Sequence, residues 1–325
     1  MGSEVEETRG AAVDVALVVE GLRKRYSGPP PVDAVRGIDL VVPGGELFGL
    51  LGPNGAGKTT TVGMCTTRVI PSGGRVQVAG IDVLADPSAA RGRIGVVTQF
   101  NTLDRSCTVF ENLYYHCRYF GMGRQAASAR ARELLESFQL ADRASANIDA
   151  LSGGMAQRLQ VARAIAHNPD VLFLDEPTAG LDPQSRIALW DLLRDLDRQG
   201  TTIILTTHNM EEADVLCDRL AIIDHGEILV LGTPEQLKRH VGVETVVELT
   251  LDGDREAARA ALAAAPGVHR AEELDGKVLV YLTQHDGSLP RVVELAARFG
   301  LIDLTVTEPT LETTFIQLTG RALRD

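Results

Sequence analysis

The sequence predicts a mixed α/β domain over residues 13–240, followed by a small α+β domain over residues 241–325. Continuously apolar segments of strand length alternate with helical segments, which is the pattern of a sheet covered on both faces. Residues 100–168 interrupt this series with helical sequence, which indicates a helical subdomain within the first domain. The composition then changes near residue 240, where short strands and an Ala-rich helix begin.

The composition excludes several protein classes. A chain of 325 residues with 44% hydrophobic content can form about two globular domains, and its net charge of −12 argues against a nucleic-acid binder. No uncharged apolar run reaches the roughly 18 to 20 residues that cross a bilayer, and the acidic start MGSEVEETRG lacks the features of a signal peptide. We therefore expect a cytoplasmic protein whose residues 1–12 are disordered. The four cysteines form no CxxC pair, so we expect buried thiols and no zinc site.

The first expected strand is VALVVEGLRKRY at residues 15–26, and the following loop, residues 27–32, carries prolines that cannot donate to a sheet. Residues 38–51 read IDLVVPGGELFGLL, which is two strands separated by a turn at Pro43, Gly44 and Gly45. Further strand patterns lie at residues 74–80, 93–99, 171–175, 201–208 and 219–224. Helical patterns lie between them at residues 129–140, 155–168 and 185–200.

The smaller domain alternates short strands and helices. Strand patterns lie at residues 245–251, 269–274, 277–283 and 301–306, and helical patterns at residues 254–265 and 289–300. Their order is βαββαβ, which is the order of a ferredoxin-like fold. We therefore expect a ferredoxin-like domain with an accessory or regulatory role.

A glycine-rich loop follows the apolar strand LFGLL. Its sequence GPNGAGKTT matches the pattern GxxxxGK[ST] and precedes a helix that begins near Gly57. The glycines let backbone N–H groups point inward, the helix N-terminus adds positive potential, and Lys58 supplies a full charge for the β and γ phosphates of a nucleotide. Thr59 is expected to ligate Mg²⁺ beside these phosphates. The residues expected to bind ATP here are Gly52, Pro53, Asn54, Gly55, Ala56, Gly57, Lys58, Thr59 and Thr60.

A pair of acids ends the apolar strand at residues 171–175. The segment VLFLDEPTAGLD carries Asp175 and Glu176, which are expected at the same edge of the sheet as the glycine-rich loop. Asp175 is expected to hold Mg²⁺, often through water, and Glu176 to deprotonate the attacking water as general base. The alternative is an acidic helix cap after a strand.

The segment LSGGMAQRL is a second candidate anion site. Ser152 suits the N-cap of a helix, and Gly153 and Gly154 allow a phosphate to approach the backbone. One ATP does not obviously need two helix N-termini of the same chain on its γ-phosphate, so the economical explanation is that a second subunit provides one. The alternative is an ordinary capped helix.

In this order and spacing, the three motifs resemble those of ABC transporter ATPases over about residues 13–235. The resemblance implies a P-loop cassette that hydrolyses ATP and closes head to tail as a homodimer, with ATP between one phosphate loop and the other copy's LSGG turn. It also implies that Gln99 senses Mg²⁺ and water, that His208 contacts the γ-phosphate, that Tyr26 stacks on adenine, and that Leu181 and Asp182 cross the dimer interface. For Gln99, Tyr26 and His208, the residues alone also fit ordinary packing at strand ends.

The LSGG turn departs from the common LSGGQ, because Met155 stands in place of Gln. LSGGM is similar to the variant of the daunorubicin-resistance family, the ATPases of drug exporters of the ABC-2 type. The segment PTLETTFIQLTGR at residues 309–321 also resembles that family's ending, although Thr313 and Thr314 stand where an acid and a valine are expected.

The resemblance further implies a separate transmembrane permease, a location at the cytoplasmic face of the cell membrane, and export of a hydrophobic drug, lipid or secondary metabolite. The stretch at residues 100–123 is rich in aromatic residues, which favour a docking surface for the permease and fit a subdomain core equally well. These aromatics are Phe110, Tyr114, Tyr115, Tyr119 and Phe120. The alternatives are an ABC ATPase that acts on nucleic acid or ribosomes, an importer subunit, and a regulatory module without hydrolysis.

Overall fold

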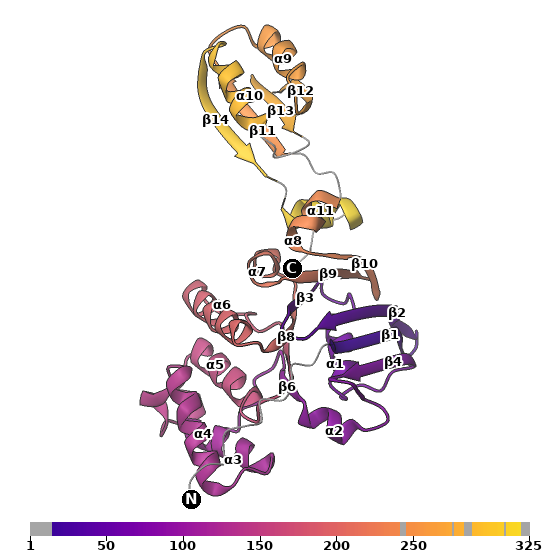
Figure 1. The fold of residues 1–325 in the computed structure, drawn as a ribbon, viewed down its shortest axis with the longest axis vertical. Coiled ribbons are helices and arrows are strands. Elements are labelled where there is room, and N and C mark those ends of the chain that lie inside the picture. Colours follow the sequence, from indigo (N-terminus) through magenta and orange to yellow (C-terminus); the bar gives the residue numbers. More distant parts are fainter. Residues whose placement is uncertain (1–14, 241–244, 275, 283–287, 309, 320–325) are drawn as a thin grey trace, which may run out of the picture. The chain divides into compact units, whose positions relative to one another are not determined.

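The computed structural model describes residues 15–240, 245–274, 276–282, 288–308 and 310–319 (Figure 1). These residues form two compact units that divide near Pro234, slightly before the change in composition at residue 240. The expected disorder of residues 1–12 concerns a segment outside the described residues. None of the described helices is long and apolar enough to span a membrane.

One sheet of the first unit is antiparallel, with the strand order β2-β1-β4-β5. Its strands are β1 (Val15–Tyr26), β2 (Val32–Pro43), β4 (Gly73–Val78) and β5 (Ile81–Asp82). Strand β1 has the bounds expected from the sequence, whereas β2 begins at Val32, in the segment expected to be a loop. Because Val32 pairs with Tyr26 and Val35 is buried, the sheet continues through this polar stretch as far as the prolines allow.

The other sheet of this unit has six strands in the order β10-β9-β3-β8-β7-β6. They are β3 (Leu47–Leu51), β6 (Ile94–Val97), β7 (Val171–Asp175), β8 (Thr202–Thr207), β9 (Arg219–Asp224) and β10 (Glu227–Gly232). All neighbours are parallel except β9 and β10. The register sets Leu51 beside Thr207 and Thr206 beside Asp175. The carboxyl ends of β3, β8 and β7 therefore meet at one edge of the sheet.

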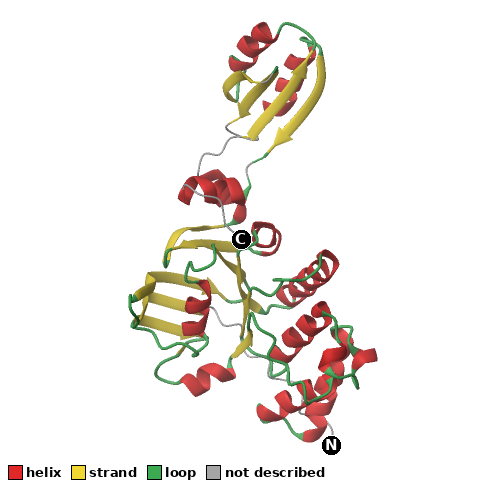
Figure 2. Cartoon of the chain, turned by 180° about the vertical axis from the view of Figure 1, so that it is seen from behind, coloured by secondary structure: helices red, strands yellow, loops and turns green. Residues whose placement is uncertain are grey.

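The helices of the first unit include a group of three, α3, α4 and α5, that contact one another and form a helical subdomain (Figure 2). The helices are α1 (Lys58–Cys65), α2 (Pro87–Gly92), α3 (Val109–Tyr119), α4 (Arg124–Ser137), α5 (Gly153–Ala164), α6 (Pro183–Arg198) and α7 (Met210–Leu216), with 3₁₀ turns at Ala141–Arg143 and Ile148–Ala150. Helix α3 begins with a capping box in which Thr108 and Glu111 satisfy each other's backbone N–H groups. Helix α4 begins earlier than its apolar pattern indicated, directly after the extended backbone of Gly123.

A single hydrophobic core joins the two sheets of the first unit. Leu17 and Val42 of the antiparallel sheet belong to the same buried cluster as Phe48 and Phe173 of the parallel sheet. Each fully buried side chain of this kind stabilises the fold by roughly 1.5 to 3 kcal/mol. The same cluster includes Cys65 at the end of α1, and burial raises the pKa of its thiol to about 12. The core thus fixes α1 and the loop before it against the parallel sheet.

The second unit contains a four-stranded sheet in the order β12-β13-β11-β14, in which all neighbours are antiparallel. Its elements are β11 (Thr245–Leu251), α9 (Arg255–Ala263), β12 (Val268–Leu274), β13 (Lys277–Leu282), α10 (Ser288–Ala297) and β14 (Leu301–Thr307). This order is that of a ferredoxin-like fold. Leu262 of α9 and Val292 of α10 share one core with Val247 and Val280 of the sheet.

Two further helices, α8 (Pro234–His240) and α11 (Leu311–Thr319), precede and follow these elements in the sequence. At the start of α11, the backbone N–H of Thr310 donates to the hydroxyl of Thr313 at 3.0 Å, and the N–H of Thr313 donates to the hydroxyl of Thr310 at 3.2 Å. The threonine that stands in place of the expected acid therefore completes the cap of this helix.

Candidate active site

The glycine-rich loop leaves β3 at Gly52 and enters α1 at Lys58. A Cβ atom on Gly52 would lie 2.2 Å from the carbonyl oxygen of Ile223, so no larger residue fits there. Gly57 has a φ of 107°, a conformation that side chains rarely adopt. Helix α1 has no side-chain cap, so its first N–H groups can bind an anion.

Lys58 lies inside this loop and is only 4% exposed. Its ammonium donates to the carbonyl oxygens of Gly52 at 2.7 Å and of Pro53 at 3.2 Å. It also lies 3.2 Å from Oε1 of Glu176, whose side chain is 8% exposed. An unpaired charge is unfavourable in the interior, and each of these two buried groups gives the other a partner. Lysine and glutamate from separate motifs thus form one cluster.

Asp175 and Thr59 form the second pair of this cluster. The hydroxyl of Thr59 donates to Oδ1 of Asp175 at 3.2 Å, and the hydroxyl of Thr206 donates to the same oxygen at 2.6 Å. Carboxylate and hydroxyl oxygens are ligands that Mg²⁺ prefers. No group of three or more His, Cys, Asp or Glu side chains within the described residues could hold a metal.

Glu176 has a left-handed backbone conformation, with a φ of 50°, which is uncommon outside glycine. Its N–H donates to the carbonyl oxygen and to the hydroxyl of Thr206, both at 3.1 Å. Oε2 lies 3.2 Å from Nδ1 of His208, which is ion-pair distance without hydrogen-bond geometry. The carboxylate of Glu176 therefore stands between two basic side chains, Lys58 and His208.

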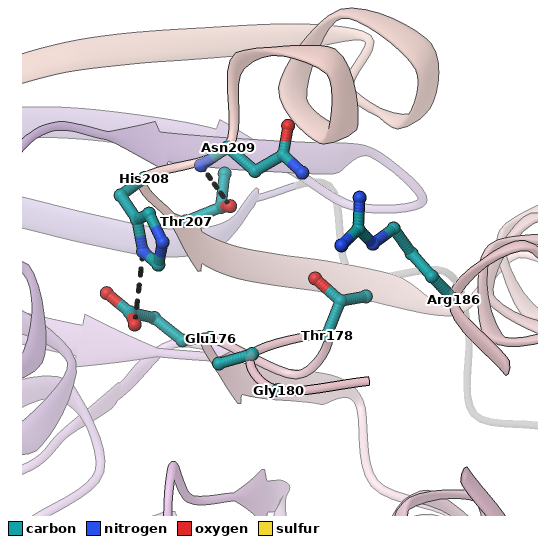
Figure 3. Close-up of a pocket in the computed structure, with 8 residues that line it drawn as sticks. Glu176, Thr178, Gly180, Arg186, Thr207, His208 and Asn209 are labelled. Carbon is teal, nitrogen blue, oxygen red and sulfur yellow. Dashed lines mark hydrogen bonds and ion pairs between the residues drawn. The ribbon is translucent and has the colours of Figure 1, made fainter. Parts of the chain in front are cut away.

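A cavity of about 100 Å³ opens beside Glu176 and His208 (Figure 3). It is lined by Glu176, Thr178, Ala179, Gly180, Arg186, Thr207, His208 and Asn209. Figure 3 shows the imidazole of His208 directed at the carboxylate of Glu176, with the side chain of Arg186 reaching in from α6. Because most of these side chains are polar, the cavity suits water and charged groups better than an apolar ligand.

The LSGG turn lies at the N-terminus of α5. Ser152 caps this helix by accepting a hydrogen bond from the N–H of Met155 at 3.3 Å, and both Ser152 and Gly153 are exposed. A Cβ atom on Gly154 would lie 2.4 Å from the hydroxyl oxygen of Ser185, so the turn packs directly on the first turn of α6. Asp182 caps α6 by accepting from the N–H of Ser185 at 3.0 Å, and hydrogen bonds from Ser185 lower the pKa of Asp182.

The structure brings together the expected residues Lys58, Thr59, Asp175, Glu176 and His208, but it leaves others apart from them. Tyr26 is 42% exposed at the end of β1, and the ammonium of Lys24 lies 4.9 Å from its ring centroid. Gln99 is exposed beyond the end of β6. Among the described residues, no hydrogen bond or ion pair joins Tyr26, Gln99 or the turn at residues 152–154 to the cluster.

Sequence reasoning missed Glu212, a buried acid that interacts with the cavity residues Thr178, Thr207 and Arg186. Glu212 is fully buried, and its Oε1 accepts a hydrogen bond from Nε1 of Trp190 at 3.1 Å. In the sequence it resembles its exposed neighbour Glu211, because two acids in the first turn of a helix are commonly solvated. The available signal was its spacing, since Glu212 shares one helical face with the apolar residue Leu216.

The chain is similar to known proteins in sequence and in fold. The family model described as "ABC transporter" matches residues 35–179. The chain is 44% identical over 313 residues to Nod factor export ATP-binding protein I of Ralstonia nicotianae, an alignment that covers 95% of each chain. It is 38% identical to the linearmycin resistance ATP-binding protein of Bacillus subtilis, over 95% of this chain and 100% of that protein.

The chain is also 39% identical to the daunorubicin/doxorubicin resistance ATP-binding protein of Streptomyces peucetius, over 95% of this chain and 94% of that protein. Among solved structures, the dimeric post-hydrolysis state of an ATP-binding cassette bound to ADP and Pi matches with a TM-score of 0.62 and 27% identity, over 67% of this chain and 98% of that chain. An ATP-binding subunit of an ABC transporter matches with a TM-score of 0.63 and 28% identity, over 70% of this chain and 93% of that chain. The chain therefore belongs to the ABC transporter family, as an ATP-binding subunit of the group that contains the ATPases of ABC-2 type exporters.

Proposed function

We propose that this ATPase powers a membrane exporter, with ATP and Mg²⁺ bound at the cluster formed by Lys58, Thr59, Asp175, Glu176 and His208. The observation that carries the proposal is the meeting of these side chains, which come from three segments of the sequence, at one edge of the parallel sheet. A cation, a carboxylate pair and an uncapped helix N-terminus at one place are what phosphoryl transfer to water requires.

In this proposal the loop at residues 52–60 binds the triphosphate. The first N–H groups of α1 donate to phosphate oxygens, and Lys58 exchanges the carbonyl oxygens of Gly52 and Pro53 for them. Bound Mg²⁺ would neutralise part of the charge on the phosphates, and the hydroxyl of Thr59 with the carboxylate of Asp175 would hold it.

Glu176 is the proposed general base. Its carboxylate accepts a proton from the attacking water, and its distance of 3.2 Å from Nδ1 of His208 supports a role for the imidazole in orienting it. The unusual backbone of Glu176 supports the same role, since such conformations cluster at functional sites. Gln99 is proposed to contact the metal and the attacking water as the family resemblance implies.

We further propose that two copies close on ATP, so that Ser152, Gly153 and Gly154 of one copy contact the γ-phosphate held by the other. The exposure of Ser152 and Gly153 supports this, because an exposed helix N-terminus can accept an anion from outside the chain. Asp182, exposed at the start of α6, is proposed to lie at the same dimer interface. The related cassette bound to ADP and Pi is dimeric, which is also in line with closure.

The proposed partner is a separate transmembrane permease, which this ATPase would bind at the cytoplasmic face of the cell membrane. Its proposed docking surface is the exposed side of α3, where Tyr115 is 54% and Tyr119 is 84% exposed. Other aromatics of this stretch serve the subdomain core, since Phe120 stacks on His167 with ring centroids 3.7 Å apart. The names of the relatives concern export of Nod factor and resistance to linearmycin and daunorubicin, so the proposed cargo is a hydrophobic drug, lipid or secondary metabolite.

The variant Glu176→Gln tests the central step. Glutamine keeps the shape of the side chain and cannot take up a proton, so we expect ATP turnover to fall by roughly 100- to 10,000-fold. ATP should still bind, and a dimer with trapped nucleotide should accumulate. Turnover and size-exclusion chromatography with ATP measure the two effects. Turnover at the parental rate would show that another group is the base.

A further inference from the structure

Glu212 is a buried carboxylate that the proposed reaction does not use. It lies in the first turn of α7 and has no exposed surface. Nε1 of Trp190 donates to its Oε1 at 3.1 Å, while its Oε2 has no hydrogen-bond partner in the described part of the chain. Placing a carboxylate in the interior is unfavourable unless its oxygens are satisfied, so stability alone does not account for an acid at this position.

The surroundings of Glu212 connect it to the candidate active site. Burial raises the pKa of Glu212, while the hydroxyls of Thr207 and Thr178 oppose that rise, as do the indole of Trp190 and the charge of Arg186. Of these neighbours, the indole is the one that reaches hydrogen-bond geometry within the described residues. Four side chains, from three different parts of the first unit, therefore oppose the effect of burial on the pKa of this carboxyl group.

Two of these neighbours belong to the loops that carry the proposed catalytic side chains. Thr178 is two residues after Glu176, and Thr207 directly precedes His208; both threonines are buried, with exposures of 6% and 2%. Thr207 also accepts a hydrogen bond from the N–H of Asn209 at 2.9 Å, which fixes the backbone on the other side of His208. Glu212 thus interacts with a residue of each loop.

The third neighbour, Arg186, lines the same cavity as Glu176 and His208 (Figure 3). Its Nε is buried and makes no hydrogen bond within the described residues, like Oε2 of Glu212. Buried polar atoms are nearly always hydrogen-bonded, so each exception needs an explanation, of which a role in catalysis is one. Arg186 lines the cavity and interacts electrostatically with Glu212, so the unsatisfied donor of one and the unsatisfied acceptor of the other support a functional role for this pair.

We infer that Glu212 is a positioning residue, which holds the loops of Glu176 and His208 in their mutual arrangement for ATP hydrolysis. The carboxylate acts through Thr178 and Thr207, and Trp190 and Arg186 keep it in place and balance its charge. The inference rests on the roles proposed above for Glu176 and His208. Small displacements of reacting groups are sufficient to slow a reaction strongly, so the effect belongs to the rate of hydrolysis and not to nucleotide affinity.

The test is the variant Glu212→Gln, which keeps the volume and an acceptor for Trp190 and removes the charge. We expect kcat for ATP to fall by roughly 10- to 100-fold while KM stays within about twofold of the parent. A merely structural role would lower Tm, without this separation of kcat from KM. Thr178→Val removes the facing hydroxyl at nearly constant volume, and a smaller fall in kcat is expected from it.

The matched control is Glu46→Gln. Glu46 is also buried, with 7% exposure, and burial raises its pKa as well, but it lies at the amino-terminal end of β3 and pairs with Arg219 at 3.3 Å. Its kcat should equal that of the parent. The inference is overturned if Glu212→Gln and Thr178→Val keep the parental kcat, or if Glu46→Gln loses as much activity as Glu212→Gln.

Glu176→Gln, measured alongside, distinguishes failure of the proposed general base from failure of the proposed positioning role of Glu212. If it removes turnover while Glu212→Gln has no effect, the proposed base stands and the positioning role fails. If Glu176→Gln retains turnover, the proposed base itself is wrong, and a fall in kcat of Glu212→Gln would no longer support positioning of that residue. If Glu212→Gln does not fold, Thr178→Val still decides the question, because it removes a neutral hydroxyl and leaves the carboxylate in place.

Discussion

The two helix N-termini proposed to contact phosphate, those of α1 and α5, have opposite surroundings. The first turn of α1 contains the buried ammonium of Lys58, which faces the carboxylate of Glu176. The first turn of α5 has exposed Ser152 and Gly153 and no acidic residue. The N-terminus of α1 therefore offers a phosphate a positive charge that is already paired within the chain. The N-terminus of α5 offers only neutral donors, and these are exposed to solvent.

This contrast separates two steps of the proposed cycle. A nucleotide that binds at α1 takes the place of the groups that Lys58 contacts within its own chain. The affinity for the nucleotide therefore depends on the charge of Lys58. Contact with Ser152 depends on a second copy, so it determines closure of the dimer and leaves the first step unchanged. Variants at the two ends should therefore differ in which step they affect.

Lys58→Ala should have the largest effect. It removes the charged donor to the β and γ phosphates, and such hydrogen bonds contribute about 1.5 to 3 kcal/mol each, so ATP affinity should fall by about 100-fold or more. Equilibrium binding of a fluorescent ATP analogue to the monomer measures this. Lys277→Ala is the matched control, because it removes an ammonium that pairs with Glu248 in the second unit. Parental affinity in Lys58→Ala would exclude the loop as the phosphate site.

Ser152→Asp and Ser152→Asn should have an intermediate effect and differ from each other. Both residues are good N-caps of similar size, so α5 and the thermal stability should be preserved in each. The aspartate adds a negative charge where the partner's phosphate is proposed to bind, which should weaken ATP-dependent dimerisation by roughly 10- to 100-fold relative to asparagine. Sedimentation of the variants with ATP, in the Glu176→Gln background, measures it.

Equal dimerisation of the aspartate and asparagine variants would break the contrast, because α5 would then be an ordinary capped helix. A weaker affinity of monomeric Ser152→Asp for ATP would also contradict the contrast. It would mean that the LSGG turn contacts the nucleotide bound by its own chain. Either outcome is distinguishable from unfolding by the thermal stability of the two variants.

Tyr26→Ala should have the smallest effect. The ring is 42% exposed at the end of β1, and stacking of an aromatic ring on a base contributes about 0.5 to 1.5 kcal/mol, so ATP affinity should fall by about 2- to 10-fold. Tyr26→Phe keeps the ring and should bind as the parent does. GTP should lose as much affinity as ATP, because stacking does not read the edge of the base. Unchanged affinity in Tyr26→Ala would remove this residue from the site.

The parts of the fold that follow from buried apolar sequence were predictable. Strands β7 and β9 have the bounds expected from their runs of Val, Leu and Ile. Strands covered on both faces are apolar at nearly every residue, so their ends are visible in the sequence. The start of β2 at Val32 was not predictable, because Val32 and Asp33 are both exposed and follow a run of prolines, so the strand depends on its pairing with β1. The division of the first unit into two sheets depends on such pairings and is not encoded locally.

The same distinction applies to the candidate site. Lys58, Asp175 and Glu176 were recognisable because motif and strand context coincide in the sequence. Glu212 was not, because its burial results from the packing of α7 against α6, and a single sequence does not reveal which of two neighbouring acids faces inward. Residues that act through others depend on tertiary packing and have no motif of their own.

The left-handed backbone of Glu176 implies a trade-off between activity and stability. A side chain in that conformation costs about 1 to 3 kcal/mol, whereas glycine adopts it freely. Replacing Glu176 with glycine would therefore relieve the backbone and remove the carboxylate that is proposed as the general base. Glu176→Gly is therefore expected to gain stability while losing turnover, which is the usual form of such a trade-off.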